Sequence, residues 1–282
     1  MSAGLWSEAV AALRRDRLAL ACAAILVILG ASAIVGPSFL DYRGDEIDWA
    51  HIAMPPFEAP GHWLGTDRLG RDLLVRTLQG LRVSLTIALA ATLVSLLIGV
   101  AWGALAGYRR GRTEALMMRF VDVLYSLPQV FFVILLTVVF GRSPLTILAV
   151  IGAFGWLTMA RIVRGQALAL REREFVDAAI VGGAGTLRIV ARHIVPNLLG
   201  PVVVYATLIL PQAILVESFL SFLGIGIQEP LASLGNLISD GAAEMETAPW
   251  MLAAPAGCLI LLVFCFNFLG DSLRDALDPS ER

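Results

Sequence analysis

The sequence predicts an all-α integral membrane protein with about six transmembrane helices. Of its 282 residues, 58% are hydrophobic and only 16% are charged, which lies outside the range of soluble globular proteins. A helix needs about 20 mainly apolar residues to cross a hydrocarbon core about 30 Å thick. Six segments meet that requirement, and we place them at 18–37, 83–107, 120–140, 144–160, 198–217 and 250–270.

The first apolar segment, 18–37, also has features of a cleavable signal peptide. Arginines precede it, and Ala31, Ser32 and Ala33 provide the small residues of a cleavage site. We expect the segment to remain as a span, because the apolar run continues to Pro37 and because its removal would invert the charge pattern of the other five.

Arginine carries all 21 basic charges, since lysine is absent. If the N-terminus is inside, most arginines lie in inner segments, and the stretch 223–249 has none. The positive-inside rule therefore predicts a cytoplasmic N-terminus, 1–17, and a cytoplasmic tail, 271–282. The inner positions are Arg14, Arg15, Arg17, Arg109, Arg110, Arg112, Arg119, Arg161, Arg164, Arg171, Arg173, Arg188, Arg192, Arg274 and Arg282, and the outer ones are Arg43, Arg68, Arg71, Arg76, Arg82 and Arg142.

The segment 38–82 is predicted to be an extracytoplasmic loop, and its first half is rich in Asp, Glu and Pro. Within 62–82, leucines recur at helical spacing and polar residues occupy the other side. This pattern predicts an amphipathic helix lying in the membrane interface, although a helix packed on other spans fits equally well. The leucines are Leu69, Leu73, Leu74, Leu78 and Leu81, and the polar residues are Arg68, Arg71, Asp72, Arg76 and Gln79.

The spans contain almost no ionisable side chain. Asp122 and Glu217 lie near the ends of the third and fifth spans. A proton-coupled carrier needs such groups near the midplane, so the pattern disfavours a secondary transporter, and we expect Glu217 to orient a helix end. Pro128 and Pro211 lie inside spans, where proline usually bends a helix.

Several kinds of chemistry are excluded or disfavoured. Without lysine the chain has no standard P-loop, so we expect no nucleotide cofactor and no catalytic residue in it. The three cysteines lack metal or CxxC spacing, and His193 has no second ligand at metal-binding spacing, so we predict no metal site. The net charge of −2 gives no reason to expect nucleic acid as a partner.

The segment 161–197 is a patterned cytoplasmic loop. We predict a short helix over 172–181 that has Phe175, Ala178, Ala179 and Gly182 on one face, closed by glycines at 182, 183 and 185. A second helix would start with Thr186 as its cap and run through His193, and Pro196 would break the chain before the fifth span. Such a helix pair can insert into a groove of a soluble partner or rest on membrane lipid.

This loop resembles the EAA motif of the permease subunits of binding-protein-dependent ATP-binding-cassette (ABC) importers. Asp177, Ala178 and Ala179 occupy the Glu-Ala-Ala positions, and Gly183 and Pro196 fall at the matching places. Asp replaces Glu, Val195 replaces Leu, and His193 takes the place of Ile. Further segments are similar to the peptide branch of the family, namely HWLGTDRLGRDLLVR from His62, MARIVRGQ from Met159, RHIVPN from Arg192, ESFLSFLGIGIQEPL from Glu217, SDGA from Ser239 and FCFNFLGDSLRDALDP from Phe264.

The resemblance implies a transmembrane domain of the MetI-like type, over 83–270, in the bacterial inner membrane. It also implies a second homologous permease subunit, two ATPase subunits that bind ATP and Mg²⁺, and an extracytoplasmic peptide-binding protein. By position in the motif, the ATPase-coupling residues would be Glu174, Phe175, Asp177, Ala178, Ala179, Gly182, Gly183 and Pro196.

The favoured function is transport of oligopeptides. A dipeptide or nickel permease of the same family is the first alternative, and a self-sufficient carrier or intramembrane enzyme is the second.

Overall fold

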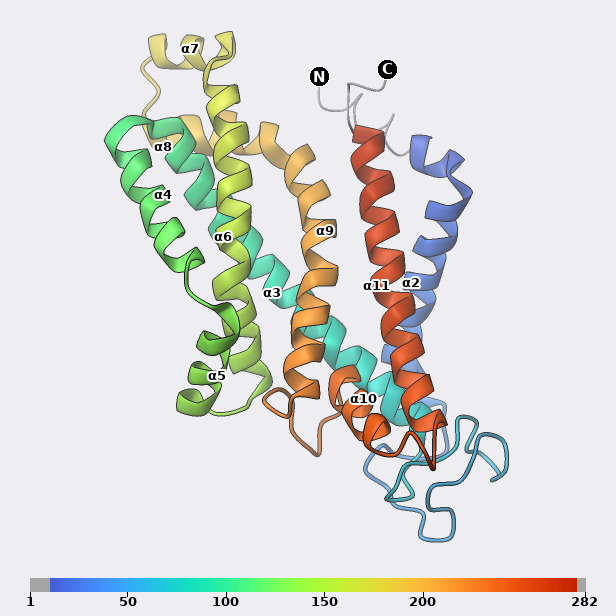
Figure 1. The fold of residues 1–282 in the computed structure, drawn as a ribbon. Helices are drawn as coiled ribbons and strands as arrows, with labels where there is room; N and C mark the ends of the chain where they lie inside the picture. The colour runs from blue at the N-terminus through green and yellow to red at the C-terminus, as the bar shows by residue number, and fades with distance from the viewer. Residues whose placement is uncertain (1–10, 278–282) are drawn as a thin grey trace.

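Long helices run through most of the molecule, and short ones cap its two ends (Figure 1). The computed structural model describes residues 11–277, and within that range Thr66 and Asp72 form only an isolated bridge, with no β-sheet. The elements are α2 (Arg17–Val35), η1 (Gly36–Ser38), α3 (Leu73–Arg109), α4 (Gly111–Tyr125), α5 (Gln129–Phe140), α6 (Pro144–Arg171), α7 (Glu174–Val181), α8 (Thr186–Ile189), η2 (Val190–Ile194), α9 (Val195–Phe222), α10 (Leu234–Ala243) and α11 (Trp250–Leu277).

Five of these helices are long and apolar enough to cross a membrane on their own, and α4 with α5 can form a sixth crossing. Large apolar side chains such as Val27, Val138 and Ile260 lie exposed on the outside of the described structure. An apolar exterior is what a bilayer requires, since lipid rather than water surrounds the helices. The predicted all-α membrane protein with about six spans is therefore confirmed.

The third span, predicted over 120–140 with a bend at Pro128, is divided into two helices at that proline. The chain turns by 78° between α4 and α5. Ser126 ends α4, and Pro128 is extended at φ −65° and ψ 106° before α5 begins. Proline has no N–H for the helical hydrogen-bond ladder, so the break at this position is physically expected, whereas Pro211 lies within an unbroken α9.

The segment 62–82 does not form a separate interfacial helix. Residues 73–82 are the first turns of α3. Asp72 caps the N-terminus of this helix, because its side chain accepts a hydrogen bond from the Val75 N–H at 2.8 Å. Leu73, Arg76 and Leu81 are buried, so this helix packs on the rest of the protein, as the alternative interpretation proposed. At 37 residues α3 is about 55 Å long, which exceeds the hydrocarbon core.

Helix α6 is likewise longer than the predicted span 144–160. It continues to Arg171, so the first part of the predicted loop 161–197 is helical and only residues from 172 onward leave the bundle. Hydropathy marks only the apolar part of a helix, and the helix continues because the arginine-rich turns that follow contain no proline and are rich in good helix formers.

Helices α3 and α6 approach each other closely along a row of small residues. Cβ atoms added at Gly99 and Gly107 would lie 2.6 Å from Met159 Cβ and 2.7 Å from Ala167 Cβ, and one at Gly103 would overlap the Ala160 carbonyl oxygen. Small residues at every fourth position allow such contact between membrane helices. This glycine spacing is visible in the sequence, although our prediction of the spans did not use it.

The helices alternate in direction across the bundle (Figure 1). The start of α2 and the end of α11 lie at the same end as α7 and α8, whereas α10 and the loop between η1 and α3 lie at the opposite end. This arrangement fits an even number of crossings between the two ends of the described chain.

Candidate functional site

Helix α7 projects from one end of the bundle and is followed by a glycine turn. Gly182 ends the helix, and Gly183 adopts φ +77°, in the left-handed region that favours glycine. The Ala184 N–H then donates to the Ala179 carbonyl at 3.0 Å, which closes the turn. The structure therefore contains the predicted short helix and glycine elbow.

The second half of this segment differs from its prediction. Gly185, not Thr186, precedes α8 in the cap position, and no side chain caps this helix. The chain passes through the π-helical η2 directly into α9, so Pro196 does not break it. Pro196 lies at the junction of η2 and α9, where the Val195 N–H bonds to the Val190 carbonyl and the helix stays continuous.

One residue anchors α7 to the bundle. Val176 is fully buried in an apolar cluster with Val163, Ile189 and Ile194, and Ala179 packs against this cluster. Most of the predicted face of small residues is left accessible by the chain itself. Phe175 is 39% exposed, and Ala178 and Gly182, like Glu174 and Asp177, are exposed at the end of the molecule.

Several large apolar side chains are exposed on this segment. Val181 is 89% exposed and Leu187 is 75% exposed, and Ile180 is also exposed. Together with Phe175 they form an apolar surface on α7, the elbow and α8, which we call the α7 surface. Apolar surface outside the membrane spans commonly marks a site for a protein partner.

Three arginine contacts connect helix α6 to neighbouring helices. Arg164 donates from Nε to Glu114 Oε1 on α4 at 2.6 Å, and Arg161 donates to Asp122 on α4 at 2.7 Å. Arg171 donates to the Tyr108 carbonyl of α3 at 2.6 Å. Helix α6 is therefore tied to both α3 and α4.

A cavity of about 290 Å³ lies among α3, α4, α5, α6 and α9, beside the break between α4 and α5. Its lining combines apolar side chains with uncharged polar ones, which include Thr92, Tyr125, Gln129, Thr158 and Gln212. Hydropathy did not identify these positions, because isolated Thr and Gln residues hardly change the average over an apolar span. Uncharged polar groups can hydrogen-bond a ligand without binding it by charge.

Glu217 does not line this cavity. It is fully buried near the end of α9, where Ser221 Oγ donates to its Oε1 at 2.8 Å. The donor, Ser221, lies one turn further along the same helix, so this oxygen is hydrogen-bonded within α9. The contact agrees with the expectation that Glu217 orients a helix end.

Comparison with known proteins identifies the family. Residues 99–282, well over half of the chain, match the family described as binding-protein-dependent transport system inner membrane component. The chain belongs to this family. Residues 4–56 match a second family, described as the N-terminal TM domain of oligopeptide transport permease C. The resemblance found in the sequence is thus confirmed, and the chain is a multi-pass membrane component of a transport system.

Its similarity to characterised relatives extends over nearly the whole chain. The oligopeptide transport system permease protein OppC of Escherichia coli (strain K12) is 51% identical over 278 residues, which cover 99% of this chain and 92% of the relative. The protein of the same name from Haemophilus influenzae is 50% identical, with 99% and 89% covered. The dipeptide transport system permease protein DppC of Bacillus subtilis (strain 168) is 43% identical over 271 residues, with 96% and 84% covered.

The fold also matches a solved structure. The chain is similar to an inward-facing structure of the MetNI methionine ABC transporter, with a TM-score of 0.58 and 20% sequence identity. The match covers 73% of this chain and 96% of the other. The predicted MetI-like fold of the transmembrane domain is therefore confirmed.

Proposed function

We propose that the chain is the permease subunit of an ATP-driven importer and forms half of a translocation pathway for oligopeptides. The observation that carries this proposal is the 50–51% identity to oligopeptide permeases over 99% of the chain. The cavity beside the α4–α5 break, with its uncharged polar lining, supports a pathway for peptides rather than for a small ion.

The partners follow from the same assignment. A second homologous permease subunit would complete the pathway, two ATPase subunits would bind ATP and Mg²⁺, and an extracytoplasmic binding protein would deliver peptide. The arginine distribution supports cytoplasmic termini in the bacterial inner membrane, with α7 on the same side. The chain itself would hydrolyse no ATP.

The α7 surface is proposed as the contact with one ATPase. It is apolar, and α7 is tied into the apolar core mainly by Val176, with Ala179 beside it, so a groove could bind the exposed side of the helix without disturbing the bundle. The proposed coupling residues are those of the motif on this segment. They are Glu174, Phe175, Asp177, Ala178, Ala179, Gly182, Gly183 and Pro196.

Uptake measured in the native host tests the substrate. We expect deletion of this chain to abolish uptake of labelled peptides longer than dipeptides, and the wild-type chain supplied in trans to restore it. If the deletion affects only dipeptides or only Ni²⁺, the chain belongs to a dipeptide or nickel system instead. If purified chain transports peptide in liposomes without any ATPase, the proposal is wrong and the chain is a self-sufficient carrier.

A further inference from the structure

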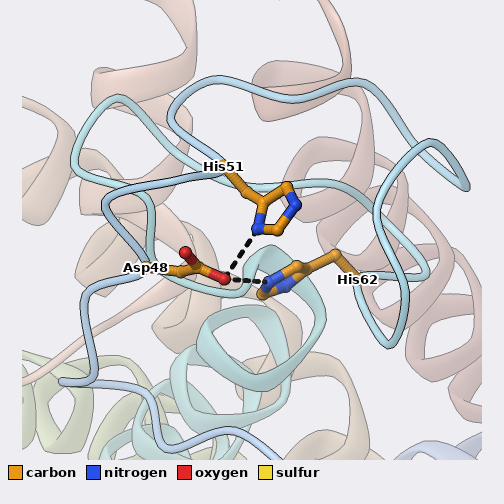
Figure 2. Close-up of side chains that lie close together, drawn as sticks. All are labelled: Asp48, His51 and His62. Carbon is orange, nitrogen blue, oxygen red and sulfur yellow. Dashed lines mark hydrogen bonds and ion pairs between the residues drawn. The ribbon is translucent and has the colours of Figure 1, made fainter.

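The loop between η1 and α3 gathers two of the three histidines of the chain around one carboxylate (Figure 2). Asp48 Oδ2 lies 2.8 Å from His51 Nδ1 and 3.6 Å from His62 Nε2. All three ligand atoms lie within 4.8 Å of one another. The sequence predicts no such cluster, because the spacing of these residues matches no metal-binding motif and only the folded loop joins them.

His62 is held in one orientation. It is 1% exposed, Tyr42 stacks on its ring at a centroid distance of 4.0 Å, and its Nδ1 lies 2.8 Å from Asp72 Oδ2. The other oxygen of Asp72 accepts the Val75 N–H at the start of α3. Because an ionised carboxylate only accepts, His62 Nδ1 carries the proton of this hydrogen bond.

This arrangement leaves His62 Nε2 buried without a hydrogen-bond partner. In a neutral histidine the ring nitrogen without a proton carries a lone pair. In His62 this nitrogen is Nε2, and it faces Asp48 Oδ2 at 3.6 Å. Two acceptors that face each other at this distance are unfavourable unless a proton or a metal cation lies between them. A histidine that donates its other N–H to a carboxylate is also the usual second-shell arrangement of a metal ligand.

We propose that Asp48, His51 and His62 form a binding site for a divalent transition-metal ion, with Zn²⁺ as the representative metal. The ligands would be Asp48 Oδ2, His51 Nδ1 and His62 Nε2, and water would complete a tetrahedron. Asp72 orients His62 from the second shell. The proposal is independent of the transported substrate.

The distances fit this metal. Zn–N and Zn–O bonds of about 2.0–2.1 Å in a tetrahedron place ligand atoms about 3.3–3.4 Å apart. The Asp48–His62 distance of 3.6 Å is close to this value, and the Asp48–His51 distance of 2.8 Å has to open by about 0.5 Å. His51 is half-buried, so its other ring nitrogen can carry the proton towards solvent when Nδ1 binds the metal.

The metal would fasten the loop to the transmembrane helices. Asp48 is already hydrogen-bonded to two other parts of the loop. Its Oδ1 accepts from the Ala50 N–H at 2.9 Å, and the Asp48 N–H donates to the Gly70 carbonyl at 3.0 Å. From His62 the contact continues through Asp72 into the first turn of α3. Metal binding would therefore order the loop at the end of the molecule opposite α7 (Figure 1).

Direct metal titration tests the proposal. The full chain is purified in detergent with a tag that contains no histidine, stripped with a chelator and titrated with Zn²⁺ against a chromogenic competitor. We expect about one Zn²⁺ per chain, a higher melting temperature with Zn²⁺, and the visible absorption of a tetrahedral site with Co²⁺. The variants His51→Ala and Asp48→Asn, which alter partly exposed side chains, should weaken binding by more than about 100-fold, and Asp72→Asn by about 10–100-fold.

The third histidine provides the matched control. His193 lies in η2 at the other end of the molecule, so His193→Ala should bind Zn²⁺ like the wild type. The proposal would be overturned if the wild type binds no more Zn²⁺ in this titration than the His51→Ala/Asp48→Asn double variant does. In that case His62 would be an imidazolium held between Asp48 and Asp72.

Discussion

Arg76 Nη2 lies 3.3 Å from Glu229 Oε1, although 153 residues separate the two in sequence. Arg71 Nη1 donates to the same oxygen at 2.9 Å, and Arg71 Nε donates to Asp67 at 2.6 Å. Arg76 is 1% exposed, so its charge is balanced inside the protein rather than by solvent. Two of the arginines predicted to lie outside, Arg71 and Arg76, therefore belong to an internal ion-pair network.

Removal of Arg76 should destabilise the chain strongly. Arg76→Leu would leave Asp67 and Glu229 with one cation fewer, and we expect a loss of about 2–3 kcal/mol of folding free energy, measured as a lower melting temperature in detergent. Arg68→Leu is the matched control, because the Arg68 side chain is 54% exposed and lies 4.0 Å from Asp240. Its effect should stay below about 0.5 kcal/mol. Equal losses in the two variants would contradict the network.

The same network predicts a pH dependence. Burial tends to raise the pKa of Glu229, but the hydrogen bond from Arg71 and the charges of Arg71 and Arg76 outweigh it, so this pKa lies below its ordinary value of 4.5. A carboxylate with a lowered folded-state pKa adds stability that is complete above 4.5 and disappears as the pH falls through the folded-state value. The difference in melting temperature between wild type and Glu229→Gln should therefore be constant near neutral pH and shrink below pH 4.5. A difference that persists in acid would refute this.

The spans and the glycine elbow could be predicted from the sequence because their signals are local. A run of about 20 apolar residues identifies a crossing, and the glycines at 182 and 183 identify a helix end. Lengths were less predictable. Hydropathy does not indicate where α3 and α6 end outside the membrane, and it averages over the break at Pro128.

Contacts between distant segments were not predictable from one sequence. The pairing of Arg76 with Glu229 and the gathering of His51 and His62 at Asp48 depend on how loops fold. The residue that packs α7 on the bundle was not predicted either. Val176 makes this buried contact, and nothing in the local sequence distinguishes it from the other apolar residues of the helix.

The contact between α3 and α6 predicts a strong effect of one methyl group. Gly103→Ala would drive Cβ into the Ala160 carbonyl, so the helices must separate, and we expect reduced membrane levels and a lower melting temperature. Gly165→Ala on α6 is the control, because its Cβ would meet no atom within 4 Å. In a helix that change should be neutral or stabilise by up to about 1 kcal/mol. Comparable membrane levels for both variants would show that the close approach is unimportant.

The α7 surface predicts a defect in coupling without a defect in folding. Ala178 is exposed, so Ala178→Trp should be accommodated within the chain, and Gly183→Val strains the elbow at φ +77°. We expect the double variant to insert normally into the membrane but to lose peptide uptake and co-purification of the ATPase. Gly183→Asn, which tolerates the left-handed conformation, should keep both. Wild-type uptake by the double variant would exclude α7 as the coupling element.

The ion pair between Arg164 on α6 and Glu114 on α4 predicts a defect that a charge swap can repair. Both side chains are at least partly accessible, so its loss should change stability by less than about 1 kcal/mol. If the pair carries motion of α7 to α4, however, Glu114→Arg should lower peptide uptake at unchanged membrane level, since Arg164 then faces a like charge. The swap Glu114→Arg with Arg164→Glu should restore the attraction and recover uptake. Failure of the swap to recover uptake, while each single variant stays well inserted, would show that the helices are coupled by packing rather than by this pair.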